Sequence, residues 1–201
     1  MKMFGLIDDL YEIGCIKIGS YKLKSGLITP FYVDLRHLIS YPKILEKLAD
    51  ALWEKISKTS PDRVCGVPYN AIALTSIICF KYNIPMLLKR KEKKDYGTKK
   101  MVEGLYHPSE KCAIVEDVIV SGQSVIETIE PLEELGLSIQ DIFVIVDREQ
   151  GGSLALEKLG YNVTSLFKIS EIFTHLKLRG KISSHDFDQF KRFVETHPVH
   201  F

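Results

Sequence analysis

Two adjacent carboxylates mark the segment of this sequence that is best suited to chemistry. Residues 112–124 read Cys-Ala-Ile-Val-Glu-Asp-Val-Ile-Val-Ser-Gly-Gln-Ser, so an apolar run ends in Glu116 and Asp117 and a small-residue turn follows. The backbone N–H groups of residues 120–124 would surround an anion at the start of the next helix, where the helix dipole favours negative charge. Carboxylates repel a phosphate, so they need another partner, such as ribose hydroxyls or a hydroxyl-bound Mg2+. The segment therefore predicts a site for a sugar phosphate.

An alternative interpretation of the same segment is a strand-to-helix turn whose acids only cap the helix and contact solvent. Ser124 and Glu127 have the spacing of a Ser-x-x-Glu capping box, which we expect at the start of that helix. Two other phosphate motifs are excluded, because the segment contains neither Gly-x-x-x-x-Gly-Lys-Ser/Thr nor Gly-x-Gly-x-x-Gly.

A strongly basic segment is the second feature with chemical potential. Residues 89–103 read Lys-Arg-Lys-Glu-Lys-Lys-Asp-Tyr-Gly-Thr-Lys-Lys-Met-Val-Glu, with seven basic residues and almost nothing that a core would bury. A loop of this length inside a compact domain is usually functional or disordered. A merely solvated surface loop is the alternative, because runs of charge are often no more than that.

Apolar periodicity indicates the elements that would position these residues. Strands are predicted at residues 16–18, 21–23, 31–35, 63–67, 86–89, 111–115, 141–146 and 162–166. Helices are predicted at residues 4–13, 44–56, 71–82 and 125–135, with Pro42 at a helix start and Gly136 and Gly160 at helix ends. Apolar strands that alternate with helices predict an α/β fold, with a doubly wound, mainly parallel sheet and helices on both faces.

The two ends of the chain lie outside this alternation. A sequence of 201 residues fits a single domain that can bury a full core. We expect a small N-terminal hood at about residues 1–40, a core at about residues 41–170 and a C-terminal helical segment at about residues 171–201.

Composition excludes several classes of protein. With 45% hydrophobic residues, 26% charged residues and a net charge of +1, nothing draws the chain toward nucleic acid or an anionic membrane. Residues 71–80 form the longest mainly apolar stretch, which is too short to span a bilayer, and the first residues lack a secretory pattern, so we expect a cytoplasmic protein. The four cysteines contain no Cys-x-x-Cys pair and are expected to be reduced and buried. His197 and His200 are expected to belong to a loose tail rather than to a metal site.

Several motifs together resemble those of the type I phosphoribosyltransferases, and among these the orotate phosphoribosyltransferase family. The matching segments, in the family's order, are residues 23–26 and 30–32 (orotate-side hood), 66–69 (pyrophosphate-binding loop), 90–97 (catalytic loop), 115–124 (phosphoribosyl pyrophosphate signature) and 147–152 (late strand-end motif). The resemblance is closest to the orotate phosphoribosyltransferase domain of bifunctional UMP synthase. The Asp-x-Lys-x-x-Asp signature of that enzyme's decarboxylase domain does not occur in this sequence.

The resemblance implies a reaction and a set of site residues. The reaction is transfer of 5-phosphoribosyl from phosphoribosyl pyrophosphate, the donor, to orotate, which gives orotidine 5′-monophosphate and pyrophosphate. Catalytic roles are implied for Lys94, Glu116 and Asp117. The residues implied to bind the donor are Tyr69, Arg90, Lys91, Lys94, Tyr96, Glu116, Asp117, Val120, Ser121, Gly122, Gln123 and Ser124. Those implied to bind orotate are Lys24, Tyr32, Val33, Val120 and Arg148.

The implied chemistry separates charge, because the C1–oxygen bond loosens before the C1–nitrogen bond forms. Lys94 would neutralise the departing pyrophosphate, while Glu116 and Asp117 would hold the ribose hydroxyls beside a ring with oxocarbenium character. The cofactor implied is Mg2+, held mainly through substrate oxygens, with Asp117 as the one candidate protein contact. Closure of the basic loop over the phosphates, in the site of a neighbouring subunit, implies a homodimer.

Three residues depart from the pattern of many family members. Asn70 stands where they have a lysine for pyrophosphate, Tyr96 replaces a loop histidine, and Val120 replaces a threonine. Val120 removes a side-chain hydroxyl contact and leaves the backbone N–H contacts intact. Two other functions stay open: phosphoribosyl transfer to a different base, and a non-catalytic regulator that senses the donor.

Overall fold

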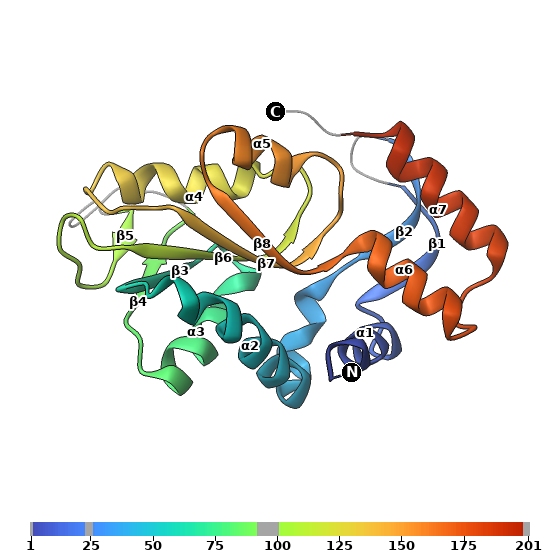
Figure 1. The fold of residues 1–201 in the computed structure, drawn as a ribbon, viewed down its shortest axis with the longest axis horizontal. Helices are drawn as coiled ribbons and strands as arrows, with labels where there is room; N and C mark the ends of the chain where they lie inside the picture. The colour runs from blue at the N-terminus through green and yellow to red at the C-terminus, as the bar shows by residue number, and fades with distance from the viewer. Residues whose placement is uncertain (1, 23–25, 92–100, 199–201) are drawn as a thin grey trace.

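A mainly parallel six-stranded sheet is the centre of the computed structural model, which describes residues 2–22, 26–91 and 101–198 (Figure 1). The strands are, in spatial order, β5 (Val102–Glu103), β4 (Met86–Lys89), β3 (Arg63–Gly66), β6 (Cys112–Ile119), β7 (Asp141–Asp147) and β8 (Asn162–Lys168). All neighbours pair in parallel except β5, which runs antiparallel to β4. The predicted doubly wound α/β fold is therefore confirmed.

Helices cover both faces of this sheet. Figure 1 shows α2 (Pro42–Ile56) and α3 (Asn70–Tyr82) below the sheet, and α4 (Gln123–Glu133) and α5 (Gly152–Lys158) above it. The buried residues of α2 recur at helical spacing and are Leu45, Leu48, Ala49, Leu52 and Ile56. Pro42 is its first residue, as predicted, because the fixed φ of proline suits a helix start.

Both ends of the chain build a second layer beside the sheet. The antiparallel pair β1 (Ile16–Lys22) and β2 (Ile28–Val33) lies next to α1 (Lys2–Glu12), α6 (Ile169–Leu178) and α7 (Ser184–Thr196) (Figure 1). The rings of Phe173, Phe190 and Phe193 surround the fully buried Phe31. The hood is thus made from the N-terminal strands and the C-terminal helices together.

Three short elements connect these layers. The 3-10 helix η1 (Leu35–Ser40) follows β2, and a second one, η2 (Ser57–Thr59), follows α2. Asp34 begins η1 by accepting a hydrogen bond from the backbone N–H of Arg36. The two-residue strand β5 was not predicted, because two residues carry no readable period; it holds the far end of the basic segment beside β4.

Two boundaries differ from the prediction at the segment that bears the carboxylates. Strand β6 continues to Ile119, four residues past the predicted end, because Val118 and Ile119 still pair with β7. Helix α4 begins at Gln123 rather than Val125. Glu116 and Asp117 are therefore held in a strand, which fixes their backbone more firmly than a loop would.

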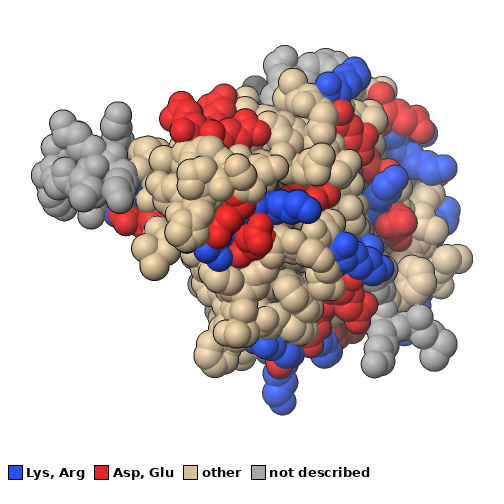
Figure 2. All heavy atoms as spheres, turned by 60° about the vertical axis from the view of Figure 1, so that its left-hand side comes forward, with Lys and Arg blue, Asp and Glu red and all other residues tan. Residues whose placement is uncertain are grey.

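The surface and the thiols agree with the composition. On the face shown in Figure 2, basic side chains lie among acidic ones and form no continuous patch within the coloured residues. Cys15, Cys65, Cys79 and Cys112 are all free and buried, as predicted. In the described ranges, no helix combines the length and the apolar character that crossing a bilayer requires.

Candidate active site

The site begins where β3 ends and β6 continues. The last parallel pair between these strands joins Gly66 to Val115, whereas β6 stays paired to β7 up to Ile119. Glu116 and Asp117 therefore lie just beyond the carboxyl end of β3. Ligands of open α/β sheets bind at the carboxyl ends of strands, so this edge is the expected place for a site.

Glu116 is a buried carboxyl with two hydrogen-bond donors. Its side chain is 5% exposed, and its oxygens accept from the Asp117 N–H at 2.9 Å and from Ser124 Oγ at 2.8 Å. Burial, together with the nearby Asp117 carboxyl, raises the pKa of Glu116 well above its usual value. The protein thus favours the neutral acid here until something nearby stabilises the negative charge.

The predicted capping box of Ser124 and Glu127 is wrong. The residue before α4 is Gly122, with φ of 89°, and it makes no side-chain cap. The hydroxyl of Ser124 donates to Glu116 instead, and Glu127 accepts from Gln123 Nε2 at 3.2 Å. Ser124 therefore connects the helix start to the carboxylate pair.

Asp117 is oriented from two sides. One oxygen accepts from the Val118 N–H at 2.9 Å, and the other accepts from Asn70 Nδ2 at 2.9 Å. Asn70 is the first residue of α3 and directly follows the 66–69 loop. From the sequence, Asn70 is expected only to weaken a pyrophosphate contact. In the structure it fixes the carboxylate of Asp117, a partner that is 47 residues away in the chain.

The turn after β6 is packed against the turn after β7. The Gly152 N–H donates to the Val120 carbonyl oxygen at 3.0 Å, and Gly151 and Gly122 adopt φ of 108° and 89°. A Cβ atom on Gly152 would lie 2.5 Å from that same oxygen and 2.8 Å from the carbonyl carbon of Ser121. Only glycine allows this approach, so Gly152 shapes the predicted phosphate loop from outside it.

The basic side of the site is described in part. Lys91 Nζ lies 5.5 Å from the ring centroid of Tyr69, which is 64% exposed beyond β3. Arg90 pairs with Glu103 at 3.3 Å, and its N–H donates to the Met101 carbonyl at 2.8 Å, so the two ends of the basic segment lie side by side. The predicted residues Lys24, Lys94 and Tyr96 lie outside the described residues.

Arg148 stands at the next strand end, opposite Val120. Its N–H donates to the Ile119 carbonyl at 3.1 Å, and its side chain is 7% exposed. Burial lowers the pKa of Arg148 to about 10, which still leaves the guanidinium charged near neutral pH. Its carbon Cζ lies 4.8 Å from the ring centroid of Phe31. The structure thus brings the predicted donor loop and the predicted orotate arginine to adjacent strands.

The remaining predicted acceptor residues come from β2. Tyr32 and Val33 are both half-buried, and the Tyr32 hydroxyl accepts from Arg36 Nη2 at 3.3 Å. Gln150, which is not among the predicted site residues, is 3% exposed and donates from Nε2 to the His197 carbonyl at 3.0 Å. The expectation that His197 lies in a loose tail is therefore wrong, because its ring also stacks on Phe193 at 4.5 Å.

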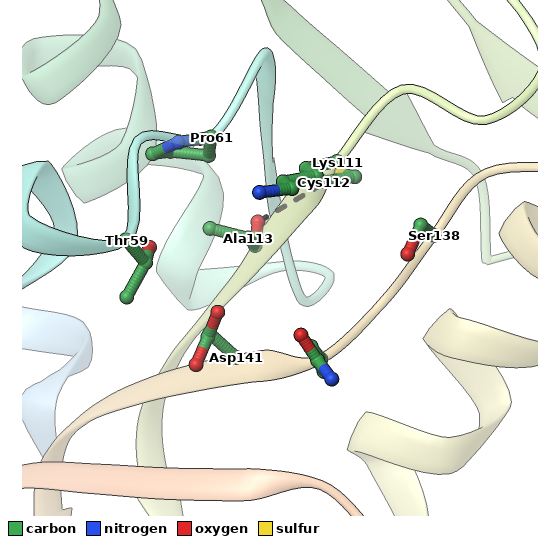
Figure 3. A pocket seen from close by; sticks show the side chains of 8 residues that line it. Thr59, Pro61, Lys111, Cys112, Ala113, Ser138 and Asp141 are labelled. Carbon is green, nitrogen blue, oxygen red and sulfur yellow. Dashed lines mark hydrogen bonds between the residues drawn. The ribbon is translucent and has the colours of Figure 1, made fainter.

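A separate pocket lies at the opposite edge of the sheet (Figure 3). It has a volume of about 250 Å³ and is lined by Thr59, Pro61, Lys111, Cys112, Ala113, Ser138, Gln140 and Asp141. These residues precede β3 or begin β6 and β7, so they lie at the amino ends of the strands. Ligands of parallel sheets bind at the other edge, and the carboxylate pair is there.

The described residues contain no group of three or more His, Cys, Asp or Glu side chains that could hold a metal ion. Asp117 keeps free lone pairs on a partly exposed carboxylate and could provide one oxygen ligand to a hydrated Mg2+.

The fold and this site define the chain as a type I phosphoribosyltransferase. The structure of Leishmania donovani UMP synthase superposes with a TM-score of 0.88 and 29% identity, covering 98% of this chain and 43% of that one. Orotate phosphoribosyltransferase of Chlamydia caviae is 38% identical over 192 residues, which cover 94% of this chain and 93% of that protein. This chain belongs to the orotate phosphoribosyltransferase family.

A longer relative has the same segment. Bovine uridine 5′-monophosphate synthase is 44% identical over 192 residues, and the match covers 94% of this chain and 40% of the bovine protein. The chain thus spans less than half the length of that relative. No protein-family model matches the chain.

Proposed function

We propose that this chain transfers 5-phosphoribosyl from phosphoribosyl pyrophosphate to orotate, forming orotidine 5′-monophosphate and pyrophosphate in pyrimidine biosynthesis. The observation that carries the proposal is that β6 carries Glu116 and Asp117 near its carboxyl end, while Arg148 directly follows the adjacent strand β7. A sugar phosphate and an anionic base need opposite charges within one crevice, and this edge supplies both. Family membership points to the same substrates.

The donor half supplies preorganised negative charge. Asp117 would accept a ribose hydroxyl while Asn70 keeps its carboxylate in place. The raised pKa of Glu116 shifts it toward the neutral form in the free protein, and a hydroxyl donor together with a ribose that gains positive charge would favour its ionised form. Charge held in a buried place stabilises the transition state more than the same charge in water does.

The phosphate half relies on backbone and on basic side chains. The N–H groups of residues 120–124 would bind the 5-phosphate at the start of α4. Arg90, Lys91 and Lys94 would neutralise the departing pyrophosphate, with Tyr69 and Tyr96 beside them. Mg2+, when bound, would supply further positive charge on the pyrophosphate oxygens, and Asp117 is the carboxylate that could contact it.

The acceptor half would hold orotate by its carboxylate. Arg148 offers a planar set of N–H donors that suits bidentate binding of a carboxylate. Tyr32, Val33 and Val120 would contact the flat pyrimidine, and Lys24 would add a second positive charge. Val120 would make only apolar and backbone contacts, since it has no hydroxyl.

A homodimer belongs to this proposal, with the basic loop acting across the subunit interface. In its support, Ile39, Tyr69, Phe80 and Leu105 are large apolar side chains with exposed fractions between 64% and 91%. A single copy leaves these apolar side chains in water, and a partner copy would cover those that it contacts. We infer a cytoplasmic, reducing location from the four free and buried thiols.

The test is an activity measurement with matched bases. Mixing the protein with donor, Mg2+ and orotate should lower the orotate absorbance, while uracil, adenine and hypoxanthine should give no product. Turnover of another base in preference to orotate would contradict the assignment of Arg148. Donor binding with turnover of no base would instead indicate a regulator.

A further inference from the structure

The side chain of Arg148 is held by an aromatic ring. Its Cζ atom lies 4.8 Å from the centroid of Phe31, and both side chains are at least 93% buried. Two guanidinium nitrogens, Nε and Nη2, are buried and have no hydrogen-bond partner in the described parts of the chain. The Phe31 ring is thus in direct contact with this charge, to which Tyr32 also contributes favourably.

An aromatic ring face differs from a carboxylate as a partner for the Arg148 guanidinium. A carboxylate beside Arg148 would hold the guanidinium but would occupy its N–H donors and cancel its charge. The quadrupole of an aromatic ring attracts the cation through its face and takes up no donor. The N–H groups are then not occupied by a protein acceptor, so an anionic ligand that enters beside them can still accept their hydrogen bonds.

Phe31 is itself held from the C-terminal end of the chain. Phe173 of α6 meets it at 5.3 Å, and Phe190 and Phe193 of α7 meet it at 5.5 Å and 5.9 Å, with interplanar angles between 69° and 89°. These T-shaped contacts pack Phe31 against the C-terminal helices, and the guanidinium lies over the same ring. Gln150, two residues after Arg148, donates to the carbonyl of His197 just beyond α7. Helix α7 is therefore connected to Arg148 by two routes.

We propose that Phe31 is a positioning residue for the acceptor, whose ring face holds the Arg148 guanidinium in place and leaves its N–H donors free for the acceptor carboxylate. This inference rests on the proposed function, because it assigns the carboxylate of orotate to Arg148. It also makes α7, through Phe190 and Phe193, a determinant of acceptor binding.

The test changes the ring's electrostatics and keeps its shape. Phenylalanine with one fluorine and then with three fluorines is incorporated at position 31, which weakens the quadrupole stepwise. The KM for orotate should rise with each step, by roughly 10-fold at three fluorines, since a desolvated cation–π contact is worth up to about 30-fold in affinity. The donor KM and the melting temperature should change little, because the packing volume is nearly kept.

Position 173 provides the matched control. Phe173 is fully buried in the same cluster and stacks on Phe190 at 3.9 Å, and Phe31 is the ring that lies over the guanidinium. The same fluorinated residues at position 173 should leave the orotate KM unchanged. Phe31→Leu, which removes the ring face, should raise the orotate KM by about 30-fold.

Three results would count against the inference. An orotate KM that stays constant when fluorine is introduced at position 31 would overturn it. An equal rise of the orotate KM at positions 31 and 173 would also overturn it, because packing alone would give that result. Failure of the unmodified protein to use orotate at all would overturn the proposed function and this inference with it. The first two results leave the proposed function standing.

Discussion

Gly152→Ala is the change whose effect on the donor loop follows most directly from the geometry. Gly152 is the first residue of α5 and has no positive φ, so alanine fits the backbone there without strain. The new methyl group would nevertheless lie 2.5 Å from the Val120 oxygen and 2.8 Å from the Ser121 carbonyl carbon. Both atoms belong to the backbone, so no side-chain rotation can relieve the contact.

The size of the effect can be bounded. To reach ordinary contact distances, the two turns must separate by roughly 1 Å, and overpacking of this kind costs about 1–3 kcal/mol. Such a cost corresponds to about 5- to 150-fold in an equilibrium constant. A misplacement of about 1 Å in groups that position a substrate is also known to cost about 100-fold. We therefore expect kcat/KM for the donor to fall by about 10- to 100-fold.

The assay is steady-state kinetics with each substrate varied in turn, together with thermal unfolding. The donor KM should rise much more than the orotate KM, since the displaced atoms lie in the proposed phosphate loop. Gly5→Ala in α1 is the matched control, because its Cβ would meet nothing within 4 Å, and it should leave both KM values unchanged. A Gly152→Ala protein with wild-type donor KM and melting temperature would refute the steric argument.

Three further predictions concern the carboxylate pair and the thiols. Asn70→Ala should raise the donor KM about 3- to 10-fold, since Asp117 loses one hydrogen bond worth about 1 kcal/mol; an unchanged KM would show that Val118 alone orients Asp117. The raised pKa of Glu116 means that its contribution to stability is present at low pH and is lost as pH rises through the folded-state pKa. Glu116→Gln, which keeps the neutral form, should therefore raise the melting temperature more at about pH 9 than at about pH 5, and a constant difference would contradict the raised pKa. Burial raises the pKa of Cys15 to about 11, of Cys65 to about 12 and of Cys79 to about 11. At about pH 8, the native protein should therefore react slowly with a thiol reagent, and the denatured protein should react quickly.

The fold was predictable because its signals are local. Strand β7 is buried almost throughout, and α2 repeats its apolar residues at helical spacing, so each segment reveals its own environment. Hydrogen bonds between distant residues left no such signal. The contact of Asn70 with Asp117 and the contact of Gln150 with His197 each join residues 47 positions apart.

The capping box shows how a correct pattern can predict the wrong contact. Ser124 and Glu127 have the right spacing, but a buried carboxyl on the preceding strand competes for the same hydroxyl. Glu116 is buried where water hardly reaches, so leaving its carboxyl without the hydrogen bond from Ser124 would cost more free energy than leaving the helix start uncapped. Sequence spacing cannot show which of these two hydrogen bonds Ser124 makes, because the choice depends on burial.

The two halves of the site depend on different parts of the chain. Glu116, Asp117 and the loop at residues 120–124 are fixed by the β6–β7 ladder and by the close approach of Gly152, all within the central sheet. Arg148 begins from the same sheet, but its side chain rests on Phe31, which the C-terminal helices hold in place. Changes in α7 should therefore alter acceptor binding and leave donor binding intact, because no described hydrogen bond joins α7 to the donor loop. Under the proposed function, the hood that both ends of the chain build would thus act on the base, while the sheet would act on the sugar phosphate.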